Sequence, residues 1–251
     1  MAFCELKYFS PALGKATAAN VILPEGQKGP FAVFYLLHGL SDDHSIWQRR
    51  TSLERYVANL PLIVVMPDGG RSFYCDAVEG AAYETAIVRD LVNYVDTVFN
   101  TRAEREGRCI GGLSMGGYGA VKLALKFPEM FASANSHSGA LGFGHMKANP
   151  RDALTAEFMR IVGKNPKGGD NDCHALAEKL KGKRKRPALR IDCGVDDFLI
   201  EHNRGFVADL NKLNYKHEYE EFAGGHSWEY WDEHVQEAIA FHARNLGLVQ
   251  E

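Results

Sequence analysis

Uninterrupted apolar runs recur along this chain, and each one predicts a β-strand. The clearest lie at 31–37, 62–66 and 108–113. Runs of this length without alternation are typical of strands that are covered on both faces of a sheet. Weaker runs at 132–137 and 189–193 predict two further strands. The segment 217–222 alternates between apolar and polar residues and predicts a strand at the sheet edge.

Helical spacing of apolar residues appears between these runs. The segment 83–99 would place one apolar face toward the core, formed by Ile87, Leu91, Tyr94, Val95 and Val98. Two shorter stripes predict later helices: Phe206, Leu210 and Leu213, then Val235, Ile239 and Phe241. Strands that alternate with helices indicate an α/β fold with a mostly parallel sheet and helices on both faces. Apolar segments at 6–8 and 19–23 predict an antiparallel hairpin ahead of it.

The segment 141–187 breaks this rhythm because it is polar and lies between two predicted strands. We interpret it as a small cap insertion with short helices at 153–162 and 173–180. Its basic run at 181–186 could be a nucleic-acid patch, but a solvated loop ahead of a strand fits an acidic chain better. The whole chain, 1–251, is then expected to be one domain that carries this cap.

Composition narrows the class of protein. A hydrophobic content of 45%, a charged content of 24% and a net charge of −3 are ordinary for a globular protein and favour neither nucleic acid nor a membrane surface as partner. No run of about 18 apolar residues occurs, and the start does not resemble a secretory signal. Five scattered cysteines without a CxxC pair favour a reduced, cytoplasmic protein. The sequence leaves open whether the chain forms a homo-oligomer.

The pentapeptide Gly112-Leu113-Ser114-Met115-Gly116 carries the strongest chemical signal. It follows a predicted strand and precedes a helix-like run at 119–127. A sharp turn between strand and helix exposes a serine hydroxyl at the end of a sheet, and its two glycines avoid backbone clashes. We therefore predict that Ser114 is a nucleophile.

A serine hydroxyl needs a base within hydrogen-bond reach and a carboxylate that orients the base. In this type of fold the order along the chain is serine, acid, histidine. His226 follows a strand-like run and two glycines, which single it out from His137, His202, His217 and His234. The acid comes from the adjacent pair Asp196 and Asp197, of which we prefer Asp197, partly on the resemblance given below. Asp192 lies within a strand and is less suitable.

The oxyanion that forms on the attacked carbonyl needs fixed hydrogen-bond donors. One should be the N–H of Met115, directly after the nucleophile, and the second should come from the loop after the strand 31–37. That loop reads His38-Gly39-Leu40, and the N–H of Leu40 is our choice. We expect His38 to hold the loop through hydrogen bonds.

No metal or organic cofactor is expected from the sequence. The segment 42–44 has ligand types but no partners at metal-binding spacing, and no HExxH motif occurs. No phosphate-binding or dinucleotide-binding glycine motif is found at the required position either.

Nearly the full length of the chain resembles the putative-esterase family of α/β-hydrolases, which includes esterase D, tributyrin esterase and feruloyl or acetyl-xylan esterases. The resemblance rests on Trp47 and seven segments: 9–15, 20–25, 36–40, 66–70, 112–117, 193–199 and 224–231. The opening and the last segment are most similar to the tributyrin-esterase branch. The resemblance implies an α/β-hydrolase fold, a triad of Ser114, Asp197 and His226, and oxyanion donors at Leu40 and Met115.

The resemblance also implies a serine carboxylesterase that hydrolyses short-chain acyl esters, some of them on sugars, through an acyl-enzyme. Phe73, Tyr74 and Trp228 are candidates for the substrate pocket, and simple packing of these aromatic rings is an equal alternative. Three other functions stay open: hydrolysis of S-formylglutathione, acyl transfer to a sugar, and a non-catalytic binding protein on the same fold. The N-terminal half is shorter than, and different in sequence from, what the S-formylglutathione hydrolase branch leads us to expect, which disfavours that substrate. The natural ester stays undetermined.

Overall fold

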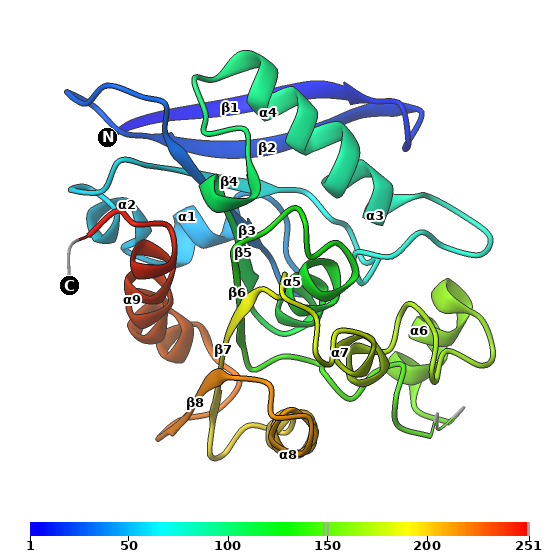
Figure 1. Ribbon diagram of the computed structural model, residues 1–251. Helices are drawn as coiled ribbons and strands as arrows, with labels where there is room; N and C mark the ends of the chain where they lie inside the picture. Colours follow the sequence, from blue (N-terminus) through cyan, green and yellow to red (C-terminus); the bar gives the residue numbers. More distant parts are fainter. Residues whose placement is uncertain (148, 150, 250–251) are drawn as a thin grey trace.

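The computed structural model describes residues 1–147, 149 and 151–249, and its centre is one eight-stranded sheet (Figure 1). The order of strands across the sheet is β1-β2-β4-β3-β5-β6-β7-β8. In chain order the strands are β1 (Ala2–Ser10), β2 (Lys15–Leu23), β3 (Ala32–Leu37), β4 (Leu62–Pro67), β5 (Arg108–Gly112), β6 (Ser133–His137), β7 (Ala188–Gly194) and β8 (His217–Phe222).

The sheet is antiparallel at one end and parallel through the rest. The strands β1 and β2 form a nine-residue ladder, and β2 continues antiparallel onto β4. Every neighbouring pair from β4 to β8 is parallel. The predicted hairpin, the parallel strands and the position of 217–222 at the sheet edge are all confirmed. In a parallel sheet the carboxyl ends of the strands meet at one edge, and the loops there can converge on a site.

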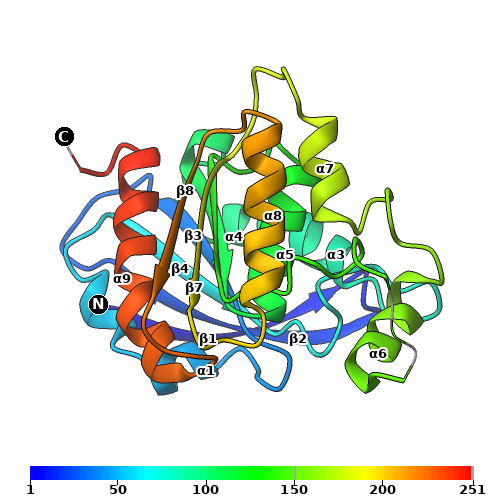
Figure 2. The same ribbon diagram turned by 90° about the horizontal axis from the view of Figure 1, so that it is seen from below.

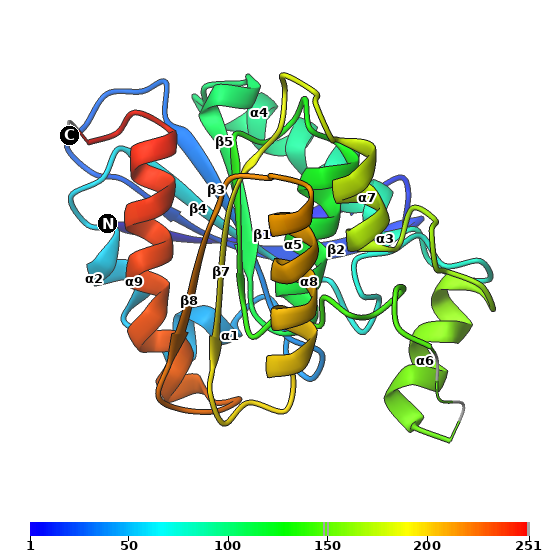
Figure 3. The ribbon, with the colours of Figure 1, turned by 60° about the horizontal axis from the view of Figure 1, so that its bottom comes forward.

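Helices cover both faces of the sheet (Figures 2 and 3). They are α1 (Ile46–Arg50), α2 (Leu53–Tyr56), α3 (Tyr83–Thr85), the π-helical η1 (Ala86–Leu91), α4 (Val92–Val98), the 3₁₀-helical η2 (Arg105–Gly107), α5 (Met115–Lys126), α6 (Ala153–Val162), α7 (Cys173–Lys179), α8 (Ile200–Lys212) and α9 (Trp228–Asn245).

Alternate residues of the buried strands face two separate core layers. In β3, Val33 and Tyr35 pack in the layer beneath η1, α4, α5, α7 and α8, whereas Phe34 and Leu36 pack in the layer beneath α1, α2 and α9. A strand places successive side chains on opposite faces, so an uninterrupted apolar run supplies both layers at once.

The segment 83–99 shows one difference from the sequence expectation. It is helical throughout, but its central turn is the π-helix η1. Ile87, Leu91 and Val95 are buried as predicted, while 51% of the Val98 side chain is exposed. A π-turn has an i→i+5 hydrogen bond and shifts the helix phase, so a stripe drawn at 3.6 residues per turn loses its last member. The helices α1 and α2 have no clear periodicity and were not predicted.

The segment 141–187 carries the helices α6 and α7, close to the expected bounds. Of this segment, residues 148 and 150 lie outside the described residues, as do 250 and 251 of the expected domain. Figures 2 and 3 show that α6 stands apart from the sheet while α7 lies beside α5 and α8. Arg71 forms two hydrogen bonds to Glu157 of α6, at 2.8 and 2.6 Å, which tie this helix to the loop after β4.

No helix in the described part of the chain is long and apolar enough to cross a membrane.

Candidate active site

Ser114 lies in a strained turn between β5 and α5. Its backbone has φ 54° and ψ −115°, a conformation that side chains other than glycine rarely adopt. A Cβ atom on Gly112 would lie 2.6 Å from the carbonyl oxygen of Leu37, and one on Gly116 would lie 2.5 Å from the same oxygen. Only glycine therefore allows β3 to approach the turn this closely, which is the reason for the spacing of the pentapeptide.

The structure brings the hydroxyl of Ser114, the imidazole of His226 and the carboxylate of Asp197 into one chain of hydrogen bonds. His226 Nε2 lies 3.0 Å from Ser114 Oγ, and His226 Nδ1 lies 2.9 Å from Asp197 Oδ2. The Asp197 side chain is completely buried, and the His226 side chain is 20% exposed. An imidazole whose Nδ1–H donates to a carboxylate presents Nε2 as an acceptor for the serine proton.

Backbone packing between the loops after β7 and β8 sets this geometry. The N–H of Asp196 donates to the carbonyl of Gly224 at 3.0 Å. A Cβ atom on Gly194 would lie 2.3 Å from that same carbonyl oxygen. The glycines before Asp197 and before His226 thus allow the two loops to touch, so residues 29 positions apart meet.

The two adjacent aspartates have different environments. Asp196 is exposed, whereas Asp197 is buried and also accepts the N–H of Leu199 at 2.8 Å. Burial by itself would raise the pKa of Asp197, but hydrogen bonds from His226, Leu199 and Ser138 outweigh burial and hold the pKa below its usual value. Asp197 is therefore the carboxylate that can orient the histidine.

The sequence predicts the N–H groups of Leu40 and Met115 as oxyanion donors. Within the described part of the chain, neither group donates a hydrogen bond to the protein. Met115 is the first residue of α5, where helix N–H groups lack intrahelical partners. A Cβ atom on Gly39 would lie 3.8 Å from Cβ of Ser114, so the loop that carries Leu40 runs beside the nucleophile.

His38 holds that loop from within the protein. Its ring is buried, its Nδ1 lies 2.7 Å from the carbonyl oxygen of Gly39, and its Nε2 accepts the N–H of Gly69 at 2.9 Å. These bonds assign the proton to Nδ1 and leave His38 no nitrogen for catalysis. The ring joins the loops after β3 and β4, in agreement with the expected structural role.

The three aromatic candidates for the substrate pocket differ in position. Phe73 and Tyr74 are 1% and 0% exposed, and the Tyr74 hydroxyl donates to the carbonyl of His38 at 3.0 Å. Their burial favours the packing alternative. Trp228 is partly exposed and stands edge-on to Trp47, with ring centroids 5.3 Å apart.

Two neighbours of the site were missed by the sequence reasoning. Phe198 is 67% exposed, and its ring centroid lies 4.5 Å from that of His226. Ser138 has a positive φ of 49°, and its hydroxyl accepts the indole N–H of Trp231 at 3.3 Å beside Asp197. An aromatic residue next to the acid was the available signal for Phe198. Nothing in the local pattern distinguishes Ser138.

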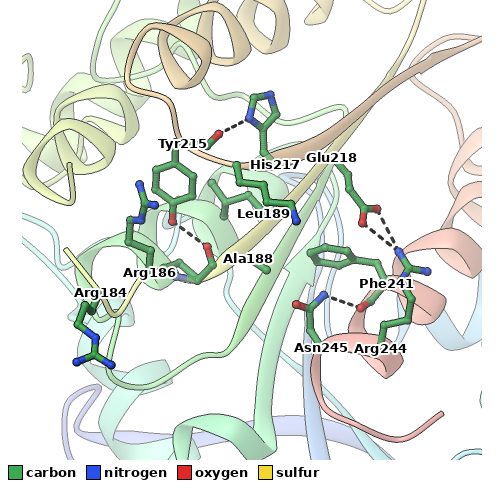
Figure 4. A pocket seen from close by; sticks show the side chains of 12 residues that line it. Arg184, Arg186, Ala188, Leu189, Tyr215, His217, Glu218, Phe241, Arg244 and Asn245 are labelled. Atoms are coloured by element: carbon green, nitrogen blue, oxygen red, sulfur yellow. Dashed lines mark hydrogen bonds and ion pairs between the residues drawn. The ribbon is translucent and has the colours of Figure 1, made fainter. Parts of the chain in front are cut away.

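A basic hollow of about 500 Å³ lies elsewhere, at the amino ends of β7 and β8 (Figure 4). Its lining includes Arg184, Arg186, His217 and Arg244, and Arg186 lies over the ring of Tyr215 at 4.8 Å. Ser114, Asp197 and His226 instead follow the carboxyl ends of their strands. The hollow is therefore at the opposite end of the sheet from the triad geometry. Residues 181–185 form an exposed turn ahead of β7.

An acetyl esterase and two solved hydrolase structures are similar to this chain over nearly its full length. The acetyl esterase of Caldicellulosiruptor saccharolyticus is 30% identical, over 95% of this chain and 97% of that protein. The substrate-bound structure of a fluorophosphonate-binding serine hydrolase from Staphylococcus aureus superposes with a TM-score of 0.85 and 32% identity, over 96% of this chain and 98% of that one. An S-formylglutathione hydrolase of the same organism has a TM-score of 0.83, the same identity and the same coverage.

The sequence profile described as "Putative esterase" matches residues 10–242. The fold is that of the α/β-hydrolases, with a mostly parallel sheet of eight strands. The chain thus belongs to the putative-esterase family and is a serine carboxylesterase, a hydrolase of carboxylic esters.

Proposed function

We propose that Ser114, His226 and Asp197 are the catalytic triad and that the chain hydrolyses short-chain acyl esters, acetyl esters first among them. The observation that carries this proposal is the pair of distances from His226: 3.0 Å to Ser114 Oγ and 2.9 Å to Asp197 Oδ2. The acetyl esterase that is similar over nearly the whole length of both chains supports the acyl group.

The reaction follows from this geometry. Ser114 Oγ attacks the ester carbonyl carbon while His226 Nε2 takes the hydroxyl proton, and Asp197 stabilises the imidazolium that forms. The N–H groups of Leu40 and Met115 bind the oxyanion of the tetrahedral intermediate. The imidazolium then protonates the departing alcohol, which leaves an acyl group on Ser114. A water molecule then gives a proton to His226 and attacks the acyl carbon. The second tetrahedral intermediate collapses, the acid leaves, and His226 returns the proton to Ser114 Oγ.

The segment 141–187 is proposed to act as the cap that sets acyl length. A cavity of about 110 Å³ within it is lined by Phe143, Met146, Phe158 and Met159, among others. The loop that leads into it is anchored at the nucleophile, because the N–H of Ala140 donates to the carbonyl of Ser114 at 3.1 Å. This volume is far below the several hundred Å³ of pockets for drug-sized ligands, and it suits a short acyl chain.

Covalent labelling tests the nucleophile. A fluorophosphonate should label the folded wild-type protein at one equivalent, with Ser114 Oγ displacing fluoride to form a phosphonate ester, as identified by peptide mass spectrometry. Ser114→Ala should abolish labelling, whereas Ser45→Ala, at a serine outside the site, should not alter it. Labelling that persists in Ser114→Ala, or that is absent from the folded wild type, would contradict the proposal.

Substrate profiling tests the acyl group. We expect kcat/KM on p-nitrophenyl acetate and butyrate to exceed that on the octanoate ester. A flat or rising profile with chain length would contradict a small acyl cavity.

Thioester hydrolysis is the second candidate, because an S-formylglutathione hydrolase superposes over 96% of this chain with a TM-score of 0.83. A kcat/KM on S-formylglutathione far above that on every acetyl ester would establish it in place of the first.

The cysteines bear on the compartment. All five are free, and Cys75, Cys109, Cys173 and Cys193 are buried. Free thiols are usual where the surroundings are reducing, which supports the proposal of a cytoplasmic enzyme.

A further inference from the structure

A second cluster of titratable side chains lies where the loop at the start of the cap meets α7 and α8. His145 comes from the loop that opens the cap, His174 from the first turn of α7, and Asp209 from α8. One nitrogen or oxygen atom from each lies within 4.8 Å of the others. Imidazole and carboxylate donors in such proximity are the donor types that zinc takes in proteins.

The separations between these donors suit a tetrahedral ion. His174 Nδ1 lies 2.8 Å from Asp209 Oδ2. Two ligands of a tetrahedral zinc ion, each about 2.0–2.1 Å from the metal, are about 3.3 Å apart, so a small widening of this pair admits the ion. Since Nδ1 is the nitrogen that faces Asp209, it is the one that would bind the ion, and Nε2, which has no hydrogen-bond partner among the described residues, would carry the proton.

A carboxylate already orients the second imidazole. Asp172 Oδ2 lies 3.1 Å from His145 Nδ1 and also accepts the N–H of Gly168 at 2.8 Å. The other oxygen of Asp172 caps α7 by accepting the N–H of His174 at 3.0 Å. A histidine that binds a metal usually donates its other N–H to such a carboxylate, which fixes the tautomer.

The rings of His145 and His174 are stacked, with centroids 3.9 Å apart and an interplanar angle of 13°. A metal lies in the plane of each imidazole that binds it, so zinc requires the two rings to tilt out of the parallel stack. The side chain of His145 is 32% exposed and that of His174 is 8% exposed. His145 is therefore the ring that turns, and an adjoining open hollow of about 470 Å³ gives an ion access.

We propose that His145, His174 and Asp209 form a zinc-binding site, with Asp172 orienting His145. The ion would join the first loop of the cap to α7 and α8. The three proposed ligands come from separate segments at no characteristic spacing, so the sequence pattern does not indicate this site.

Zinc titration of the full chain, first treated with EDTA and exchanged into chelator-free buffer, tests the site. Competition with a chromophoric chelator should show one tight zinc ion per chain. The midpoint of thermal unfolding should rise by several degrees at free zinc about 100-fold above the dissociation constant. An absence of one-to-one binding in the folded wild type would overturn the proposal.

Matched variants place the ion. Asp209→Asn and His145→Ala should each weaken zinc binding at least about tenfold. Glu237→Gln is the control, because Glu237 is also a helical carboxylate, 3.3 Å from Nδ1 of the buried His234, but this pair belongs to no group of three donors among the described residues. Zinc affinity unchanged in both cluster variants, or lost equally in the control, would overturn the site.

A third variant uses the competing cation. Lys212 Nζ lies 2.6 Å from Asp209 Oδ1, so Lys212→Met removes a positive charge from a ligand and should tighten zinc binding severalfold. Weaker binding in Lys212→Met would count against Asp209 as ligand. Ser114→Ala should bind zinc like the wild type, so failure of the zinc site and failure of the triad are separate results.

Discussion

Asp197 and Asp192 are buried carboxylates that each contact a histidine, and of these two pairs only that of Asp197 and His226 reaches a serine hydroxyl. Asp197 and His226 lie in loops after β7 and β8, with Nδ1 and Oδ2 2.9 Å apart. Asp192 and His137 lie directly opposite each other on β7 and β6, with the same 2.9 Å separation. The local chemistry of the two pairs is nearly identical.

The surroundings of the two pairs differ. His226 Nε2 reaches Ser114 Oγ at 3.0 Å, whereas His137 Nε2 has no hydrogen-bond partner in the described part of the chain. Both side chains of the pair formed by Asp192 and His137, which we call the inner pair, are completely buried. The pair formed by Asp197 and His226 is called the outer pair. The inner pair adjoins the turn between β5 and α5, because the carbonyl of His137 accepts the N–H of Ser114 at 2.9 Å.

This comparison teaches that a histidine–carboxylate pair becomes catalytic through access and a nucleophile, and not through its own geometry. A pair in a loop at the carboxyl end of the sheet can reach substrate. The pair of Asp192 and His137 is completely buried between β7 and β6, so it can only join these two strands. The inner pair is accordingly a structural support of the turn that carries Ser114.

The largest expected effect separates the two carboxylates by activity. Asp197→Asn should lower kcat on p-nitrophenyl acetate by about 10⁴-fold, because an amide no longer holds His226 in the required tautomer. Asp192→Asn should leave kcat within a small factor of the wild type. Steady-state kinetics on folded variants measures both, and equal losses would remove the distinction between the pairs.

The second effect reverses the order. Asp192→Asn should lower the free energy of unfolding by about 3 kcal/mol, because it breaks a fully buried pair and leaves His137 without a charged partner. Asp197→Asn should cost less, since the His226 side chain is 20% exposed and water can compensate. Urea denaturation followed by circular dichroism compares them. A larger loss of unfolding free energy in Asp197→Asn than in Asp192→Asn would show that the outer pair stabilises the fold more than the inner pair does.

The third effect, which is absent at neutral pH, concerns the buried imidazole of His242. Burial, with a smaller contribution from His137, lowers the pKa of His242 to about 3, so the folded protein keeps this ring neutral. The unfolded chain takes up the proton near pH 6.5. This contribution to stability is therefore complete above about pH 6.5 and is lost as the pH falls toward 3, by up to about 1.4 kcal/mol per pH unit.

The variant His242→Gln isolates that contribution. Its free energy of unfolding should fall less steeply with acidification than that of the wild type over this window, as urea denaturation at successive pH values would show. The esterase activity at neutral pH should change little, because His242 packs against Phe34 on the opposite side of the sheet from α5. Parallel slopes for the two proteins would contradict a neutral buried His242.

The local sequence pattern was sufficient to predict the strands and the sharp turn at Ser114. The runs at 31–37 and 108–113 correspond to β3 and β5, and the glycine spacing around Ser114 matches the close approach of Leu37. These features depend on neighbouring residues, so a single sequence contains them. The local pattern predicted the helix at 83–99 but not which residues it buries at its end, because one π-turn rotated Val98 outward.

The sequence by itself determined the order of the strands along the chain, the position of a candidate nucleophile and the short set of candidate acids and bases for it. Only the tertiary structure decided that Asp197 and not Asp196 faces inward, and that His226 and not His137 reaches the serine. It alone gathered His145, His174 and Asp209. The physical reason is that periodicity is local, whereas the convergence of side chains depends on how segments distant in the chain pack against one sheet.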